Sequence, residues 1–186
     1  MRKAAFFLSV VIMVPAALFS GCGYSVRSLA YEKSTKIYVK PFENKVDLNI
    51  AEEYSDRNPY RLYRPGMETK ITDAVINRFL LDGYLKLVSK EDQADLILKG
   101  ELTNYEKQPL RYNEATKDVE EYRANIRVNM TLTDLKKGKA VWTENDFVGY
   151  TEFALVGPRA ISEDAAINDA VEDLARRVIE RTVEDW

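Results

Sequence analysis

The sequence contains no histidine, a single cysteine and only eight scattered glycines. Without histidine the chain cannot form a His-based catalytic triad, a Cys–His pair or a zinc site of the usual ligand types. The glycines do not gather into a phosphate-binding loop. A pair of carboxylates could still act as in glycoside hydrolases, because 30 acidic residues are present, but solvated surface charge explains them equally well. The composition favours a protein that is not an enzyme and uses no cofactor and no metal.

The only long apolar run lies at the beginning of the chain and ends at Cys22. Two cations precede it, residues 4–19 are almost entirely apolar, and Ser20–Gly21 leads to the cysteine. This order is that of a secretory signal, and it resembles the lipobox of bacterial lipoproteins, whose cysteine is acylated and becomes the new N-terminus. A transmembrane anchor is the alternative, but the run contains Pro15 and is shorter than the about 20 residues that cross a bilayer. We therefore predict that residues 1–21 are removed and that Cys22 carries the lipid.

Lipidation at Cys22 has consequences for the compartment and for the fold. The resemblance to lipoproteins implies the outer membrane, because an Asp after the cysteine commonly retains such proteins in the inner membrane and Gly23 stands here. No disulfide can form within the chain, so a hydrophobic core must hold the fold. Removal of Arg2 and Lys3 makes the mature chain two charges more negative than the −3 of the full sequence. An acidic, exported chain is poorly suited to binding nucleic acid.

Residue patterns divide the chain into three regions. We expect a signal peptide over 1–21, a lipidated N-terminus and tether over 22–35, and a single α/β domain over 36–186. Apolar periodicity and turn residues predict the elements of the domain. In chain order they are a strand over 36–40, a long connection over 42–65, a helix over 67–82, a strand over 84–88, a turn over 89–93, strands over 95–106, 120–133 and 139–150, and a helix over 161–184.

The clearest element is the strand over 120–133, in which apolar and polar residues alternate strictly. Such alternation is typical of a sheet with one buried and one wet face. The residues expected on the wet face are Arg123, Asn125, Arg127, Asn129, Thr131 and Thr133.

The two predicted helices each carry one apolar stripe, and the sheet has one apolar face. The economical architecture is an α+β two-layer sandwich, with two helices packed on one face of a four- to five-stranded mixed, mainly antiparallel sheet. The strand over 36–40, the helix over 67–82 and the strand over 84–88 would form one parallel crossover. The later strands would form an antiparallel meander.

Short motifs along the whole mature chain resemble the LptE family of lipopolysaccharide-assembly lipoproteins. They are Cys22-Gly23-Tyr24, the strand with Ile37, Val39 and Phe42, Asp82-Gly83 at a helix end, Ala94-Asp95-Leu96, Glu121-Tyr122, and Asp173-Leu174-Ala175 with Val178. The resemblance implies a non-enzymatic, lipid-anchored outer-membrane protein. Its domain would plug the lumen of a large β-barrel of the LptD type and bind lipopolysaccharide.

Three cations are candidates for lipopolysaccharide binding. If the strands form a meander, the connections over 107–118 and 151–160 lie at the same end of the sheet. Arg111 and Lys117 belong to the first and Arg159 to the second, and the family's basic contact residues lie in these connections. Guanidinium and ammonium groups donate to phosphates and carboxylates. Ordinary solvated loop cations are the alternative.

Two further sets of residues are candidates for contact with a partner protein. Arginine and tyrosine are favoured at interfaces, and the loop before the first helix is rich in both; its members are Tyr54, Arg57, Tyr60, Arg61, Tyr63 and Arg64. We expect this loop at the end opposite Arg111, with a fold-back over the helices as the alternative. Arg123 and Arg127 on the wet face would suit a polar barrel lumen as well as plain solvent.

Two other functions stay open at the level of the sequence. The chain could be an outer-membrane-anchored periplasmic scaffold lipoprotein of another envelope complex. It could also be an anchored hydrolase that uses two carboxylates. A stoichiometric barrel partner would separate the translocon subunit from the scaffold, and a hydrolase screen with soluble substrates would test the third function.

Overall fold

The computed structural model describes residues 31, 34–46 and 64–183. Within them the elements are β1 (Lys36–Val39), β2 (Glu43–Asn44), α3 (Met67–Asp82), β3 (Lys86–Leu87), η2 (Glu91–Gln93), β4 (Leu96–Tyr112), β5 (Val119–Asp134), β6 (Lys139–Ala154) and α4 (Glu163–Val183). The signal predicted over 1–21 and most of the tether predicted over 22–35, Cys22 included, lie outside the described residues. So do five members of the loop rich in arginine and tyrosine, which we call the Arg/Tyr loop. These five are Tyr54, Arg57, Tyr60, Arg61 and Tyr63.

The two helices form where the apolar spacing predicts them. In α3 the residues Met67, Ile71, Val75 and Phe79 share one buried face. The helix ends at Gly83, whose positive φ of 66° lets its N–H donate to the Phe79 carbonyl. At the start of α4 the Ser162 hydroxyl accepts the Ala165 N–H at 3.2 Å as a side-chain cap. Because of that cap, α4 begins two residues later than predicted.

The sheet has the order β3-β1-β4-β5-β6, and β2 pairs separately with β4. Strand β1 is parallel to both β3 and β4, so the predicted parallel crossover is confirmed. Strands β4, β5 and β6 form the predicted antiparallel meander. The pairing of β2 with β4 was not predicted, because Glu43 and Asn44 carry no strand pattern of their own.

Two strands run further than their sequences indicate. The prediction ended β4 at 106 and β6 at 150, but β4 continues to Tyr112 and β6 to Ala154. Both pair with β5, which offers backbone partners along its whole length. Irregularities between Leu102 and Asn104 and after Pro109 break the alternation in β4, so periodicity could not show the extension. Arg111 therefore lies in a strand and not in a connection.

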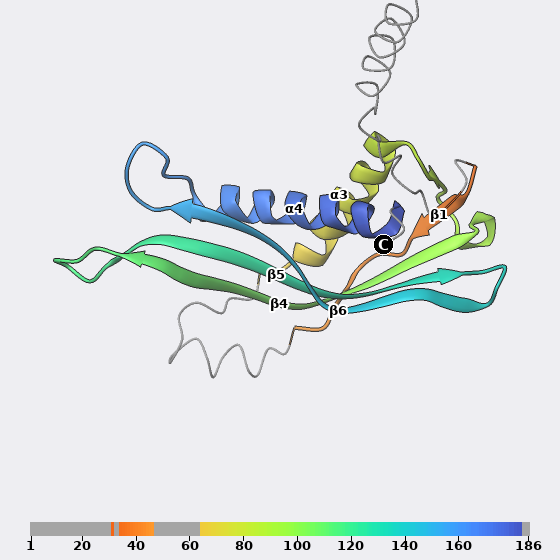
Figure 1. Cartoon of the computed structure of the whole chain (residues 1–186), viewed down its shortest axis with the longest axis horizontal. Coiled ribbons are helices and arrows are strands. Elements are labelled where there is room, and N and C mark those ends of the chain that lie inside the picture. Colours follow the sequence, from red (N-terminus) through yellow and green to blue (C-terminus); the bar gives the residue numbers. More distant parts are fainter. Residues whose placement is uncertain (1–30, 32–33, 47–63, 184–186) are drawn as a thin grey trace, which may run out of the picture.

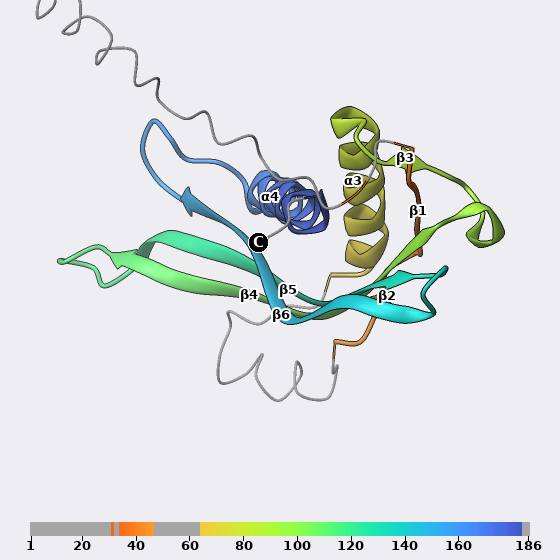
Figure 2. The same cartoon turned by 45° about the vertical axis from the view of Figure 1, so that its right-hand side comes forward.

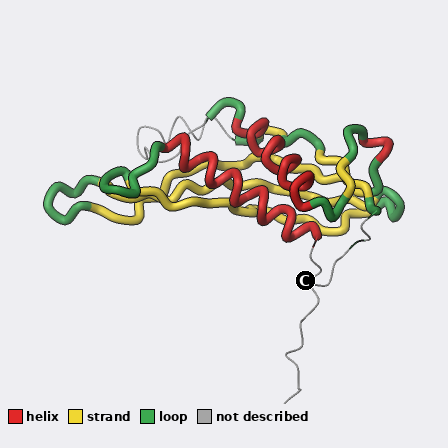
Figure 3. The backbone as a smooth tube through the Cα atoms, turned by 90° about the horizontal axis from the view of Figure 1, so that it is seen from above, coloured by secondary structure: helices red, strands yellow, loops and turns green. Residues whose placement is uncertain are grey.

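Both α-helices, α3 and α4, cover one face of the sheet, and no helix of the described residues lies on the other face (Figure 1, Figure 2). Viewed from above, α4 runs along the long strands and α3 lies beside it (Figure 3). The core between the layers includes Val75, Leu98, Leu132 and Leu174, all fully buried. The two-layer α+β fold with its mixed sheet is thus as predicted.

Candidate binding surface

The β4–β5 hairpin and the β6–α4 connection lie at the same end of the sheet (Figure 1, Figure 3). Arg111 pairs in register with Glu121, and Glu121 pairs with Ala154 of β6. Ala154 in turn forms a parallel bridge to Ala160, the residue after Arg159. The topology expected from the sequence therefore holds, and the segments carrying Arg111 and Arg159 meet at one end.

Arg111 is already engaged with two carboxylates of β5. Its guanidinium bonds Glu120, and its Nε donates to Glu121 Oε2 at 3.3 Å. Glu120 also accepts a bond from Asn113 at 2.8 Å. The Arg111 side chain is still 54% exposed, and exposed ion pairs are weak. An anionic ligand could therefore recruit this guanidinium, but only in competition with Glu120 and Glu121.

Lys117 lies in the tight turn of the hairpin. Asn113 organises this turn, because its side-chain oxygen accepts the N–H groups of Ala115 and Thr116 at 3.0 and 3.1 Å. The Lys117 N–H donates to the Asn113 carbonyl at 2.9 Å. Lys117 has a φ of 65°, which is unusual for a residue other than glycine. The turn places the Lys117 side chain in solvent.

Exposed apolar side chains lie at the same end of the sheet as these cations, a feature that was not predicted from the sequence. Leu155 is 46%, Val156 56% and Tyr112 51% exposed, and Leu110 and Ile161 are each 38% exposed. The signal that could have found them is the Leu155–Val156 pair directly before Gly157–Pro158, outside any periodic segment. This end of the sheet, which we call the amphipathic end, combines Arg111, Lys117 and Arg159 with these five apolar residues.

The helix-free face of the sheet carries Arg123 and Arg127, both held by acidic neighbours. Arg123 bonds Glu152 through Nη2 at 2.5 Å and lies 5.1 Å from the Tyr150 ring centre. Arg127 bonds Asp146 at 2.8 Å. Partial burial alone would lower the pKa of Arg127, but hydrogen bonds to Asp146 and to a second carboxylate raise it. On this face, the cationic side chains Arg123 and Arg127 are therefore held in ion pairs with acidic residues of neighbouring strands.

One residue expected on the wet face is buried instead. Asn125 is only 5% exposed, and its amide donates to Glu106 at 3.4 Å. Glu106 also accepts from Arg127 at 3.2 Å. A buried amide needs such a partner, so Asn125 belongs to the polar network within this face.

Arg64, the one described member of the Arg/Tyr loop, joins the two helices. Its guanidinium bonds Glu163 at 2.6 Å and Asp164 at 2.5 Å at the start of α4. Lys107 of β4 bonds the same Glu163 at 2.6 Å. The sequence places this loop, as a prediction, at the end of the sheet opposite Arg111. For Arg64 that is wrong, because Lys107 lies only four residues before Arg111 on the same strand.

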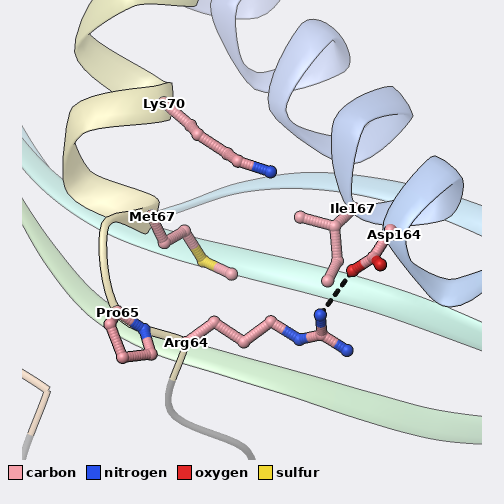
Figure 4. Close-up of a pocket in the computed structure, with 6 residues that line it drawn as sticks. All are labelled: Arg64, Pro65, Met67, Lys70, Asp164 and Ile167. Carbon is pink, nitrogen blue, oxygen red and sulfur yellow. Dashed lines mark hydrogen bonds and ion pairs between the residues drawn. The ribbon is translucent and has the colours of Figure 1, made fainter.

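The ion cluster around Glu163 borders a cavity of about 320 Å³ (Figure 4). Its lining residues are Arg64, Pro65, Met67, Lys70, Asp164 and Ile167. Burial by itself would raise the pKa of Glu163, but bonds from Lys107 and Arg64 outweigh it and hold the pKa below its ordinary value of 4.5. Burial and the neighbouring Glu163 raise the pKa of Tyr105, whose hydroxyl bonds Glu163 at 3.2 Å. The cluster links α4 and the segment just before α3 to β4.

No group of three or more His, Cys, Asp or Glu side chains in the described part of the chain could hold a metal ion. None of the helices described has the length and apolar character needed to cross a membrane.

A sequence model of the family LptE, described as lipopolysaccharide-assembly, matches residues 35–182. A search of curated protein sequences gave no match to this chain. Among solved structures, the hypothetical protein CT253 from Chlamydia trachomatis is 10% identical, with a TM-score of 0.50, over 80% of this chain and 95% of that one. It shares the fold.

Two lipoproteins resemble the chain at lower scores. The rare lipoprotein B from Shewanella oneidensis is 14% identical, with a TM-score of 0.46, over 79% of this chain and 92% of its own. An uncharacterised lipoprotein B from Nitrosomonas europaea is 14% identical, also with a TM-score of 0.46, over 85% and 88% of the two chains.

Proposed function

Because the chain belongs to the LptE family of lipopolysaccharide-assembly proteins, we propose that it is a non-enzymatic, lipid-anchored subunit of the outer-membrane lipopolysaccharide translocon. Cys22 carries the lipid, and the domain plugs and supports a β-barrel of the LptD type. The domain also binds lipopolysaccharide as it passes to the cell surface. The observation that carries this proposal is the family match over residues 35–182, which spans nearly the whole predicted domain.

The amphipathic end supports the lipopolysaccharide part of the proposal. Lipopolysaccharide is an anion that carries fatty acyl chains, so its recognition calls for cations beside apolar surface. Arg111, Lys117 and Arg159 supply donors, and Leu155 and Val156 supply exposed apolar surface at the same place. The mature chain is acidic overall, so local donors and not net charge must bind the anion.

The helix-free face supports the plug. Inside large outer-membrane barrels the wall is polar, and the face with Arg123 and Arg127 is polar and internally bonded. A partner could satisfy its remaining donors without burying an unpaired charge. We assign Arg123, Arg127 and the Arg/Tyr loop of Tyr54, Arg57, Tyr60, Arg61, Tyr63 and Arg64 to partner contact.

Affinity purification of the native protein from detergent-solubilised outer membranes tests the proposal. We expect one large β-barrel protein in about equal amounts, and an acylated Cys22 peptide by mass spectrometry. Recovery of a different envelope complex would contradict the barrel assignment.

A pair of variants tests lipopolysaccharide binding by the purified protein. Arg111→Ala/Arg159→Ala should weaken binding without unfolding the domain. Lys70→Ala/Arg176→Ala, which removes two cations from the helices, should leave binding unchanged. Equal binding by both variants would contradict the assignment of Arg111 and Arg159.

A further inference from the structure

Two lysines face each other at the end of the sheet away from Arg111. Lys36 of β1 and Lys86 of β3 are partners in a parallel pair, and both are exposed. Like charges directly opposite each other on a sheet are destabilising. Unfavourable local pairs of this kind are expected at surfaces that have a function, such as binding.

Lys40 adds a third exposed lysine to the same face. Side chains alternate along a strand, and in β1 Ile37 and Val39 are buried against the helices while Lys36 and the following Lys40 are exposed. We call Lys36, Lys40 and Lys86 the lysine face. None of the three has a salt bridge to another described residue. The carboxylate of Asp95 accepts the backbone N–H of Lys36 at 2.9 Å and pairs with the ammonium group of Lys136 at 2.9 Å.

The predicted lipid anchor enters the domain at this end. The Tyr84 hydroxyl, two residues before Lys86, donates to the Tyr31 carbonyl. Nine residue steps separate Cys22 from Tyr31, so the acylated cysteine lies within about 30 Å of the Tyr31 carbonyl. The part of β4 between Leu96 and Arg111 covers about 50 Å. The anchor can therefore lie beside the lysine face but not at the amphipathic end.

We propose that the lysine face rests on anionic phospholipid headgroups of the membrane that holds the acyl anchor. The inference depends on the lipidation of Cys22 in the proposed function. The acylated chain lacks Arg2 and Lys3 and is therefore more acidic than the full sequence with its charge of −3. Its net charge does not favour an anionic surface, so contact needs a local basic patch. Acyl anchoring combined with such a patch is a general way to hold a protein on a membrane. The contact would point the amphipathic end away from that headgroup layer.

Lysine acetylation in proteoliposomes tests this orientation with the full acylated chain. The protein is incorporated into phosphatidylcholine vesicles with or without phosphatidylglycerol, and the acetylation rate of each lysine is measured by mass spectrometry. Lys36, Lys40 and Lys86 should react at least about fivefold more slowly in the anionic vesicles, the factor that one lysine gains near such a surface. Lys70 of α3 is exposed and belongs neither to the lysine face nor to the amphipathic end; it serves as the internal control and should not change. High salt should remove the protection.

Two matched variants show whether the lysines act together. In Lys36→Gln/Lys86→Gln, the protection of Lys40 should be lost. In Lys70→Gln/Arg176→Gln, which removes the same number of charges from the helices, Lys40 should stay protected.

Equal acetylation of the lysine face in both kinds of vesicle would overturn the inference. Protection that requires an added barrel protein and not the anionic lipid would also overturn it, in favour of an acidic protein face. Failure of the proposed function would look different, because an unacylated Cys22 peptide or failed incorporation would be seen before any lysine is compared.

Discussion

Gly149 of β6 lies directly against the backbone of Leu174 in α4. A Cβ added to Gly149 would come within 2.4 Å of the Leu174 Cβ and 2.6 Å of its Cα. The backbone groups of the two residues that flank Gly149 are bonded to the same helix. The Arg177 side chain donates to the Val148 carbonyl, and the Asp173 carboxylate accepts the Tyr150 N–H. The helix is therefore seated on the strand at backbone contact.

The first prediction concerns this contact. Gly149→Ala should lower the free energy of unfolding by about 1–3 kcal/mol, the usual cost of overpacking, as measured by urea denaturation. Truncating Leu174 to Ala as well should not relieve the clash, because the obstructing Cβ and Cα remain.

Gly100 provides the contrast for this prediction. There the three atoms nearest to an added Cβ all belong to the ring of Phe42, the first at 2.1 Å. In Gly100→Ala, the further change Phe42→Leu should recover part of the lost stability, because the obstacle is a side chain. Similar relief in both double variants would contradict the assignment of the Gly149 contact to backbone.

The second prediction concerns competition for Arg111. Its guanidinium is bonded to Glu120 and Glu121, so Glu120→Gln/Glu121→Gln should free it and tighten lipopolysaccharide binding about twofold to fivefold, the range expected for exposed pairs. Binding to the purified protein at low salt measures this. Glu172→Gln, an exposed acid of α4, is the control. Unchanged or weaker binding in the double variant would show that Arg111 does not contact the ligand.

The third prediction concerns pH. The folded-state pKa of Glu163 is held below its ordinary value of 4.5, so the unfolded chain takes up the proton more readily than the folded one. The contribution of Glu163 to stability is therefore complete above about pH 4.5 and is lost as the pH falls through its folded pKa. Glu163→Gln should cost about 1–3 kcal/mol at pH 7.

The control for the pH prediction lies on the same helix. Urea unfolding between pH 7 and pH 3 should show a weaker pH dependence for Glu163→Gln than for the wild type. Glu172→Gln should follow the wild type. If the two variants had the same pH profile, the bonds from Arg64 and Lys107 would not be stabilising the charged form of Glu163.

The fourth prediction separates stability from binding at Lys117. Its φ of 65° costs a lysine more than a glycine, so Lys117→Gly should raise the free energy of unfolding by up to about 1 kcal/mol. Lys117→Gln keeps a side chain at this positive φ and should not raise the free energy of unfolding. Both variants lose the same cation, so lipopolysaccharide binding should fall equally in the two. Unequal binding would mean that the turn, and not the ammonium group, contributes to the site.

Much of the fold could be predicted because its signals are local. The stripe of α3 with Gly83 at its end placed that helix at the observed bounds, and the alternation in β5 identified its buried side. The bounds of β4 and β6 could not be predicted, because the residues beyond 106 and 150 take their extended form from pairing with β5. The lipid site at Cys22 lies outside the described residues and stays a prediction.

For the candidate site, too, one part could be predicted from the sequence and another part could not. Sequence and topology together brought Arg111 and Arg159 to one end of the sheet, but nothing in the sequence showed that Arg111 is bonded to Glu120 or that Leu155 and Val156 are exposed beside it. The position expected for Arg64 was wrong because its partner, Glu163, is 99 residues away in the chain.

By itself the sequence determined the helices, the central parts of the strands, and which face of each element is apolar or polar. These features depend on side chains only a few residues apart in the chain. Only the tertiary structure decided which charged residues form ion pairs and which lie next to a residue of the same charge. Strand register and helix packing set the distances between remote residues, so Arg64 met Glu163 while Lys36 was left opposite Lys86.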